Sequence, residues 1–68
     1  MNLKVTQDRP NEELDVALPQ DSNGFSLLDE LGLNPDEVIL LRDGSPVPLD
    51  EPLHEGDELR VLVVVSGG

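Results

Sequence analysis

The chain has 68 residues, among them fifteen acidic and four basic side chains, which gives a net charge of −11. A chain of this length forms one domain with a small core, and its negative charge disfavours binding to nucleic acids and to anionic membranes. Because the sequence contains no cysteine, disulfide bonds, thiolate metal ligands and a cysteine nucleophile are excluded. The chain shows no signal-peptide pattern and no apolar run near the roughly 20 residues of a membrane helix, so we expect a cytoplasmic protein.

Two explanations of the acidic surplus are compatible with each other. One is the solubilising surface of a salt-adapted protein, and the other is a partner with a basic docking surface. On the first explanation, added salt screens the repulsion between carboxylates and should raise the melting temperature. A melting temperature that does not change with salt concentration would contradict it.

Alternating apolar residues predict two strands near the N-terminus, at residues 3–7 and 14–18. Residues 9–13 lie between them and include Pro10 and Asn11, which favour a turn. The two strands should therefore pair as a hairpin.

A short helix is predicted within residues 25–33. The apolar residues of this segment recur at helical spacing along one stripe: Phe25, Leu27, Leu28 and Leu31. Ser22 or Asn23 is expected to cap the N-terminus of the helix, because these side chains accept hydrogen bonds from free backbone N–H groups. Gly32 is expected to adopt the left-handed conformation that ends many helices, with Leu33 folding back onto the last turn.

The second half of the chain predicts three more strand segments and one irregular crossover. In order they are an apolar strand at 38–42, a turn at Asp43 and Gly44, a short edge segment beginning at Val47, a crossover over 49–58 and a last strand at 59–65. Leu49 and Leu53 are expected to anchor the crossover in the core.

The order of these elements indicates an α+β fold in one domain. A hairpin, one helix and further strands give a mixed sheet of four to five strands with the helix packed across one face. We expect this domain to span residues 1–65, followed by a flexible diglycine tail at residues 66–68.

No catalytic constellation emerges from the residue types. The single histidine, His54, lies in the crossover and is best explained as a solvated loop residue without a metal. The acidic residues fall in loops and on outward faces, and Ser66 has no neighbouring base that could activate it as a nucleophile. We therefore expect a protein that is not an enzyme and binds no cofactor or metal.

The sequence ends in Ser66, Gly67 and Gly68. A diglycine segment has no side chains, so it can enter a narrow channel and present the Gly68 carboxylate in an extended conformation. A carboxylate reacts only after activation, and adenylation with ATP makes it an acyl donor for a thiolate, a persulfide or an amine. This pattern indicates a carrier or a tag whose chemistry is supplied by its partner.

Strand alternation predicts an apolar surface beside this tail. In the last strand Arg60 should face solvent, and the alternate residues should then face the helix: Leu59, Val61, Val63 and Val65. In the strand at 38–42, an outward Arg42 would place Leu40 outward as well. We therefore expect a partner-binding surface on the open face of the sheet, made of these residues: Leu40, Leu62, Val64, Arg60 and Ser66.

The chain resembles ubiquitin-like β-grasp proteins over its whole length. The similarity rests on three motifs in order: an Asp-Gly-x-Pro-Val hairpin at 43–47, a Gly-Asp-Glu turn at 56–58 and the Val-Ser-Gly-Gly end at 65–68. The helix segment Leu-Leu-Asp-Glu-Leu-Gly-Leu also fits. Within the class, the chain is similar to the small archaeal modifier proteins and to the small sulfur carriers of molybdopterin and thiamine biosynthesis.

This resemblance implies that Gly68 is adenylated by a ubiquitin-activating-type enzyme, which uses ATP. The activated chain would then be joined by an isopeptide bond to lysines of target proteins, and it could also take up sulfur from a donor as a thiocarboxylate. Two alternatives stay open: a dedicated carrier that delivers sulfur to an accepting enzyme for molybdopterin, thiamine or tRNA thiolation, and a plain interaction domain with an idle tail. Lys4 is the single lysine through which chains could grow, and we expect a monomer.

Overall fold

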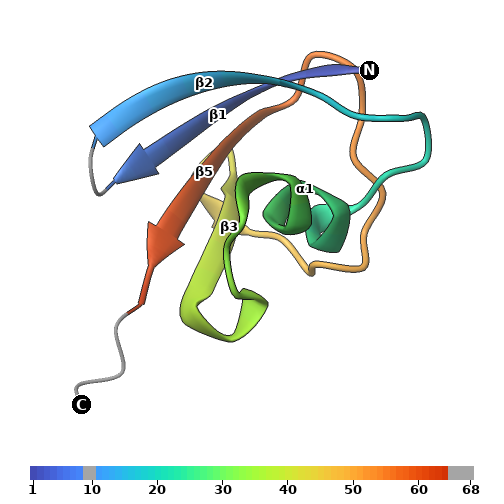
Figure 1. Cartoon of the computed structure of the whole chain (residues 1–68). Helices are drawn as coiled ribbons and strands as arrows, with labels where there is room; N and C mark the ends of the chain where they lie inside the picture. The colour runs from blue at the N-terminus through green and yellow to red at the C-terminus, as the bar shows by residue number, and fades with distance from the viewer. Residues whose placement is uncertain (9–10, 65–68) are drawn as a thin grey trace.

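One α-helix packs across one face of a five-stranded mixed sheet (Figure 1). The structure is a computed structural model that describes residues 1–8 and 11–64. Its strands are β1 (Asn2–Asp8), β2 (Asn11–Ala17), β3 (Val38–Arg42), β4 (Ser45–Pro46) and β5 (Glu58–Val63). Its helices are α1 (Gly24–Leu31) and the short 3₁₀ helix η1 (Pro35–Glu37). The predicted α+β class and the mixed sheet are confirmed.

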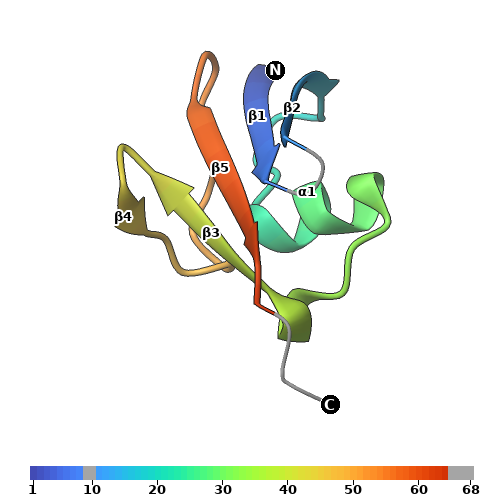
Figure 2. The ribbon, with the colours of Figure 1, turned by 90° about the vertical axis from the view of Figure 1, so that its left-hand side faces the viewer.

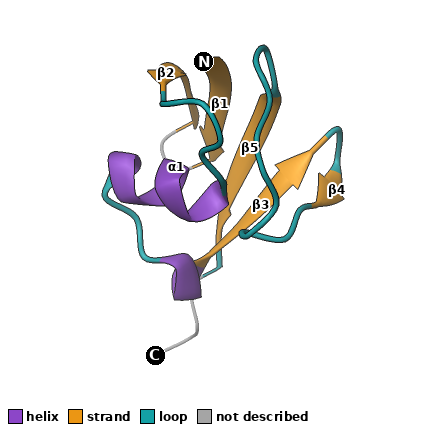
Figure 3. Ribbon diagram, turned by 90° about the vertical axis from the view of Figure 1, so that its right-hand side faces the viewer, coloured by secondary structure: helices purple, strands orange, loops and turns teal. Residues whose placement is uncertain are grey.

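The strands lie in the order β2-β1-β5-β3-β4, which places β5 at the centre of the sheet (Figure 2). β5 runs parallel to β1 and antiparallel to β3, and the two hairpin pairs, β1–β2 and β3–β4, are antiparallel. Because β5 has a neighbour on each side, the chain leaves the sheet from its middle. It does so at the end of the molecule where η1 lies (Figure 3), and the Val64 N–H donates a hydrogen bond to the carbonyl of Glu37 (2.7 Å).

Both hairpins differ in detail from the prediction. β1 and β2 pair as far as Asp8 opposite Asn11, so residues 11–13 of the predicted turn at 9–13 belong to β2. Asp43 and Gly44 form the predicted two-residue turn, with φ of 52° and 81°, values typical of a type I′ turn. The short strand begins at Ser45, earlier than predicted, and the N–H of Val47 beyond it still donates to the carbonyl of Leu40 (2.9 Å).

The predicted caps fix both ends of α1. Asn23 is the N-cap: its Oδ1 accepts from the Ser26 N–H (3.1 Å), and the Ser26 Oγ accepts from the Asn23 N–H (3.3 Å). Gly32 has a φ of 72°, and the Leu33 N–H donates to the carbonyl of Leu28 (2.9 Å), which is the hydrogen bond of a Schellman motif. Ser22 does not cap the helix, since its hydroxyl donates to the carbonyl of Pro19 (2.7 Å).

The buried stripe of α1 is narrower than predicted, because Phe25 is 49 % exposed. Gly24 approaches Leu49 so closely that a Cβ on Gly24 would lie 3.0 Å from the Leu49 Cα and carbonyl oxygen. This contact fixes the start of the helix on the crossover. Leu27 and Leu28 then point into the core, and Phe25 points away from it.

The core lies between the helix and the sheet. Its buried apolar residues come from β1, β2 and the segment after it, α1, β3, the crossover and β5: Leu3, Val5, Val16, Leu18, Leu27, Leu28, Val38, Leu40, Leu53, Leu59 and Val61. Leu49 packs against this cluster and Leu53 belongs to it, so both predicted anchors are confirmed. Each fully buried aliphatic side chain stabilises the fold by about 1.5–3 kcal/mol. In the part of the chain that the structure describes, no helix has the length and apolarity needed to span a membrane.

Candidate functional site: the open face and the end of β5

The open face of the sheet is the face opposite α1. In β5, Leu59 and Val61 are buried against the helix, so Arg60 and Leu62 project from the other face, as predicted. In β3, Val38 and Leu40 are buried, so Ile39 and Leu41 share the open face. The register places Ile39 directly opposite Leu62 and Leu41 opposite Arg60.

Four apolar residues therefore meet on this face where β5 ends. Ile39 is 42 % exposed and Val64 is 47 % exposed, while Leu41 and Leu62 are half-buried. These four residues, Ile39, Leu41, Leu62 and Val64, are named the open-face patch. Arg60 borders the patch on β5, between Leu41 on one side and Thr6 on the other.

The predicted patch was wrong in one member, because Leu40 is only 1 % exposed and belongs to the core. The error came from Arg42, which was expected to face solvent. Arg42 shares the core face of β3 with Val38 and Leu40, at the end of the strand where the crossover passes. The true patch takes Ile39 and Leu41 from β3 in place of Leu40. Two other predicted site residues, Leu62 and Val64, lie where they were expected.

Carboxylates from the crossover neutralise Arg42 at this inward position. The Arg42 Nη1 lies 2.8 Å from Glu51 Oε2, and its Nη2 lies 3.0 Å from Asp57 Oδ2. Asp57 Oδ2 also accepts from the His54 N–H (2.8 Å), which ties the cluster to the turn before β5. The side chains of Arg42 and Asp57 are 24 % and 17 % exposed, so this pair holds the crossover against the end of β3.

Replacing Arg42 with methionine is expected to lower the free energy of unfolding by about 1–2 kcal/mol. Methionine keeps the apolar stem, so the loss comes from leaving Glu51 and Asp57 without their cation. Urea unfolding followed by circular dichroism measures this loss. The matched control is Lys4→Met, because the Lys4–Glu13 pair is long at 3.9 Å and its side chains are 58 % and 67 % exposed. An equal loss in both variants would contradict the role given to Arg42.

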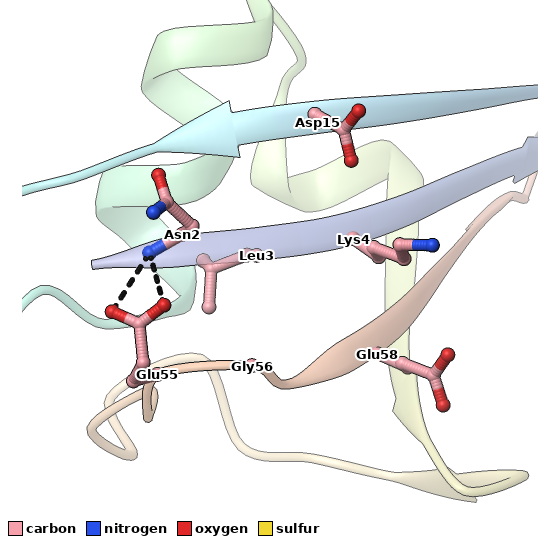
Figure 4. A pocket seen from close by; sticks show the side chains of 7 residues that line it. All are labelled: Asn2, Leu3, Lys4, Asp15, Glu55, Gly56 and Glu58. Atoms are coloured by element: carbon pink, nitrogen blue, oxygen red, sulfur yellow. Dashed lines mark hydrogen bonds between the residues drawn. The ribbon is translucent and has the colours of Figure 1, made fainter.

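The opposite end of the open face is charged. A hollow of about 290 Å³ lies there, lined by Asn2, Leu3, Lys4, Asp15, Glu55, Gly56 and Glu58 (Figure 4). The Asn2 N–H donates to both carboxylate oxygens of Glu55, at 3.1 Å each. His54 is exposed in its loop, as predicted. Within residues 1–8 and 11–64, no group of three or more histidine, aspartate and glutamate side chains could hold a metal ion.

The tail residues expected to carry the chemistry lie outside the described residues. These are Ser66, Gly67 and Gly68, together with Val65. What the structure describes is the platform that precedes them: the end of β5, the Val64–Glu37 hydrogen bond and the open-face patch.

Solved structures with the same topology define the class of this fold. The chain superposes on the crystal structure of SAMP1 from Haloferax volcanii with a TM-score of 0.75 and 24 % identity over the whole of both chains. It also superposes on a ubiquitin from Caldiarchaeum subterraneum with a TM-score of 0.73 and 17 % identity, over 100 % of this chain and 98 % of the other. The fold is therefore the ubiquitin-like β-grasp.

The family follows from the sequence comparison. The family model of small archaeal modifier protein 2 matches residues 1–65, and the chain belongs to this family. It is 37 % identical to small archaeal modifier protein 2 of Haloferax volcanii over 67 residues, which cover 97 % of this chain and 100 % of that protein. The resemblance found in the sequence is thereby confirmed.

Two further relatives match over a shorter stretch. Sulfur carrier protein TtuB of Thermus thermophilus is 43 % identical over 42 residues, which are 62 % of this chain and 65 % of that protein. An uncharacterized protein of Archaeoglobus fulgidus is 45 % identical over 42 residues, which are 62 % of this chain and 61 % of that protein. The matches thus span just under two thirds of these two relatives.

Proposed function

We propose that this chain is a ubiquitin-like protein modifier that is activated at the carboxyl group of Gly68 and joined to lysines of target proteins. The observation that supports it most is the match of residues 1–65 to the small archaeal modifier protein 2 family. The relative of that name in Haloferax volcanii aligns over its full length. A modifier needs a folded domain that a partner can recognise and an acyl group that the partner can activate, and the described domain supplies the first.

The proposed chemistry takes place on the Gly68 carboxylate. An activating enzyme transfers AMP from ATP to this carboxylate and releases pyrophosphate. The amine of a target lysine then attacks the acyl carbon, displaces AMP and loses a proton, which leaves an isopeptide bond. Gly67 and Gly68 have no side chains to obstruct entry into the enzyme, and Ser66 joins them to the domain.

The open-face patch is the proposed docking surface for the activating enzyme. Contiguous exposed apolar surface is a common sign of a partner site, and the patch lies at the end of β5 that precedes the tail. An activating enzyme that covers Leu62 and Val64 would therefore bind the domain close to the point where the tail at residues 66–68 follows, and this tail must enter its active site. Arg60 at the border can contribute a charged contact at the rim.

Sulfur transfer is the second candidate function. The similarity to sulfur carrier protein TtuB favours it, since the matched region is 43 % identical. In this use a sulfide-level donor would attack the acyl carbon of Gly68 in place of the amine and displace AMP, which leaves a thiocarboxylate. The sulfur is then held on the Gly68 carbonyl, so the absence of cysteine from the sequence does not hinder it. One activated chain can serve both functions.

Lys4 is the proposed acceptor if the modifier forms chains. It is the single lysine of the sequence, and its side chain is 58 % exposed on the open face. Because each copy carries one lysine, any lysine-linked chain would be linear, with every link made through Lys4.

A denaturing immunoblot from the source cells tests the proposed function. It compares an N-terminally tagged chain with the same chain lacking Gly68. The expected result is a ladder of heavier bands that disappears with the deletion, because the acyl donor is lost. A single band in both lanes would contradict the modifier and leave the sulfur carrier, which requires a thiocarboxylate at Gly68 in the undeleted chain.

A further inference from the structure

The outer edge of β2 is an unpaired strand edge. β2 is the first strand of the sheet order and has seven residues, whereas the opposite edge strand, β4, has two residues and includes Pro46 (Figure 2). Proline and shortness block further pairing at β4, because proline has no N–H to donate. β2 contains no proline, so only the side chains of β2 can hinder pairing of a further strand at its outer edge.

The hydrogen-bond pattern shows which backbone groups face outward. Met1 and Leu18 exchange two hydrogen bonds, from the Leu18 N–H to Met1 O (2.9 Å) and from the Met1 amine to Leu18 O (2.6 Å). In an antiparallel pair, bonded and non-bonded residue pairs alternate. The pairs Leu3–Val16 and Val5–Leu14 are then bonded.

Three residues of β2 that alternate with these bonded positions are turned the other way. Ala17, Asp15 and Glu13 occupy the non-bonded pairs, opposite Asn2, Lys4 and Thr6. Their N–H and carbonyl groups therefore point away from β1, towards the free edge. Within residues 1–8 and 11–64, no hydrogen bond to these outward groups is present.

The charge along this edge has one sign. Glu12, Glu13 and Asp15 are all exposed, and β2 contains no basic residue. Lys4 offsets little of this charge, since its contact with Glu13 is long and exposed. A second copy of the chain would place its own carboxylates against these, and like charges on neighbouring strands are destabilising. The edge therefore disfavours self-association and favours a basic partner.

We propose that the outer edge of β2 binds an extended, basic segment of a partner protein, which adds to the sheet as a further strand. Strand addition supplies affinity through main-chain hydrogen bonds and specificity through alternate side chains. Residues of the added strand that share the open face meet Glu13 and Asp15 and should be lysine or arginine. Residues on the helix side meet the half-buried Leu14 and should be aliphatic. The partner segment thus alternates basic and aliphatic residues.

This site is separate from the proposed activation site. β2 and β5 are separated by β1, which puts the two strands about 10 Å apart. Ala17 pairs with Asn2, at the end of the sheet away from Val64, because β1 and β5 run parallel. A partner on the β2 edge could therefore recognise the modifier while Gly68 is engaged. Its test needs no activating enzyme, so it is independent of the proposed function.

The test is an NMR titration of the ¹⁵N-labelled full chain at low salt. The probe is an end-capped peptide of alternating lysine and valine, seven residues long. Two controls are a peptide of the same composition with its lysines and valines in two blocks, and a peptide with glutamate in place of lysine. The expected result is that the alternating peptide alone shifts the amides of Glu13, Asp15 and Ala17 and slows their hydrogen exchange. The amides of Leu14 and Val16 already bond to β1 and should change less.

Two variants separate strand addition from simple charge attraction. Ala17→Pro removes one outward N–H and leaves every charge in place, and we expect about three- to tenfold weaker binding. Glu13→Gln combined with Asp15→Asn keeps the backbone and should weaken binding by a similar factor. Binding of the block peptide as tight as that of the alternating peptide would overturn the proposal, as would unchanged exchange at the three outward amides. Protection of these amides in concentrated protein without peptide would also overturn it, because a second copy would then be the occupant.

Discussion

A chain with alanine in place of Leu40 is expected to lose about 2–5 kcal/mol of unfolding free energy. Leu40 is 1 % exposed and belongs to β3, where it pairs with Val61 of β5 and packs in the core, so truncation leaves a cavity that the packed neighbours cannot fill. The total stability of a domain of this length is roughly 3–10 kcal/mol. The variant should therefore lose a large share of its stability and unfold at a clearly lower urea concentration.

The matched control for Leu40→Ala is Leu41→Ala, the next residue of the same strand. Leu41 is half-buried on the open face, and its truncation should cost about 1 kcal/mol or less. Because the sequence has no tryptophan or tyrosine, urea unfolding must be followed by circular dichroism or NMR. If Leu41→Ala cost as much as Leu40→Ala, the assignment of the two faces of β3 would be wrong.

Replacing Leu62 with glutamate is expected to slow activation by roughly tenfold or more at limiting modifier concentration. Leu62 lies at the centre of the open-face patch, opposite Ile39, so a charge there would be buried under the activating enzyme. The maximal rate of activation should change less than the modifier concentration that gives half of this rate, since Leu62 is not part of the tail. ATP–pyrophosphate exchange with the activating enzyme of the source cells measures both quantities.

Two comparisons make the Leu62→Glu experiment decisive. Gln20→Glu adds the same charge to the exposed loop after β2 and should leave activation unchanged. The melting temperature of Leu62→Glu should stay close to that of the unaltered chain, because Leu62 lies outside the buried core. Activation kinetics equal to those of the unaltered chain would remove the open-face patch from the proposed function.

The parts of the fold that follow local rules could be predicted from the sequence. Alternation placed Leu59 and Val61 in the core, and the residue types of Asn23 and Gly32 identified the caps of α1. The Asp43-Gly44 turn needs residues that tolerate positive φ, and that requirement is visible in the sequence. These features depend on neighbours only a few positions apart.

The parts that depend on distant neighbours could not be predicted. The segment Val-Ile-Leu-Leu-Arg at 38–42 has no alternation of apolar and polar residues. The prediction of which side chains face the core was therefore based on Arg42 alone. Its charge is accommodated by Glu51 and Asp57, nine and fifteen residues later, which no local pattern reveals. The rotation of α1 that exposes Phe25 likewise follows from the contact of Gly24 with Leu49. Hence Ile39 and Leu41 were missed, although Leu62 and Val64 were found.

The most direct test of the modifier is mass spectrometry of a tryptic digest of total protein from the source cells. Arg60 is the last basic residue, so trypsin leaves residues 61–68 attached to any lysine that the chain has modified. The predicted result is a set of target lysines that carry this segment through an amide bond to the Gly68 carbonyl. Detection of the segment solely with a free carboxylate or thiocarboxylate at Gly68 would contradict the proposal that the chain is joined to proteins.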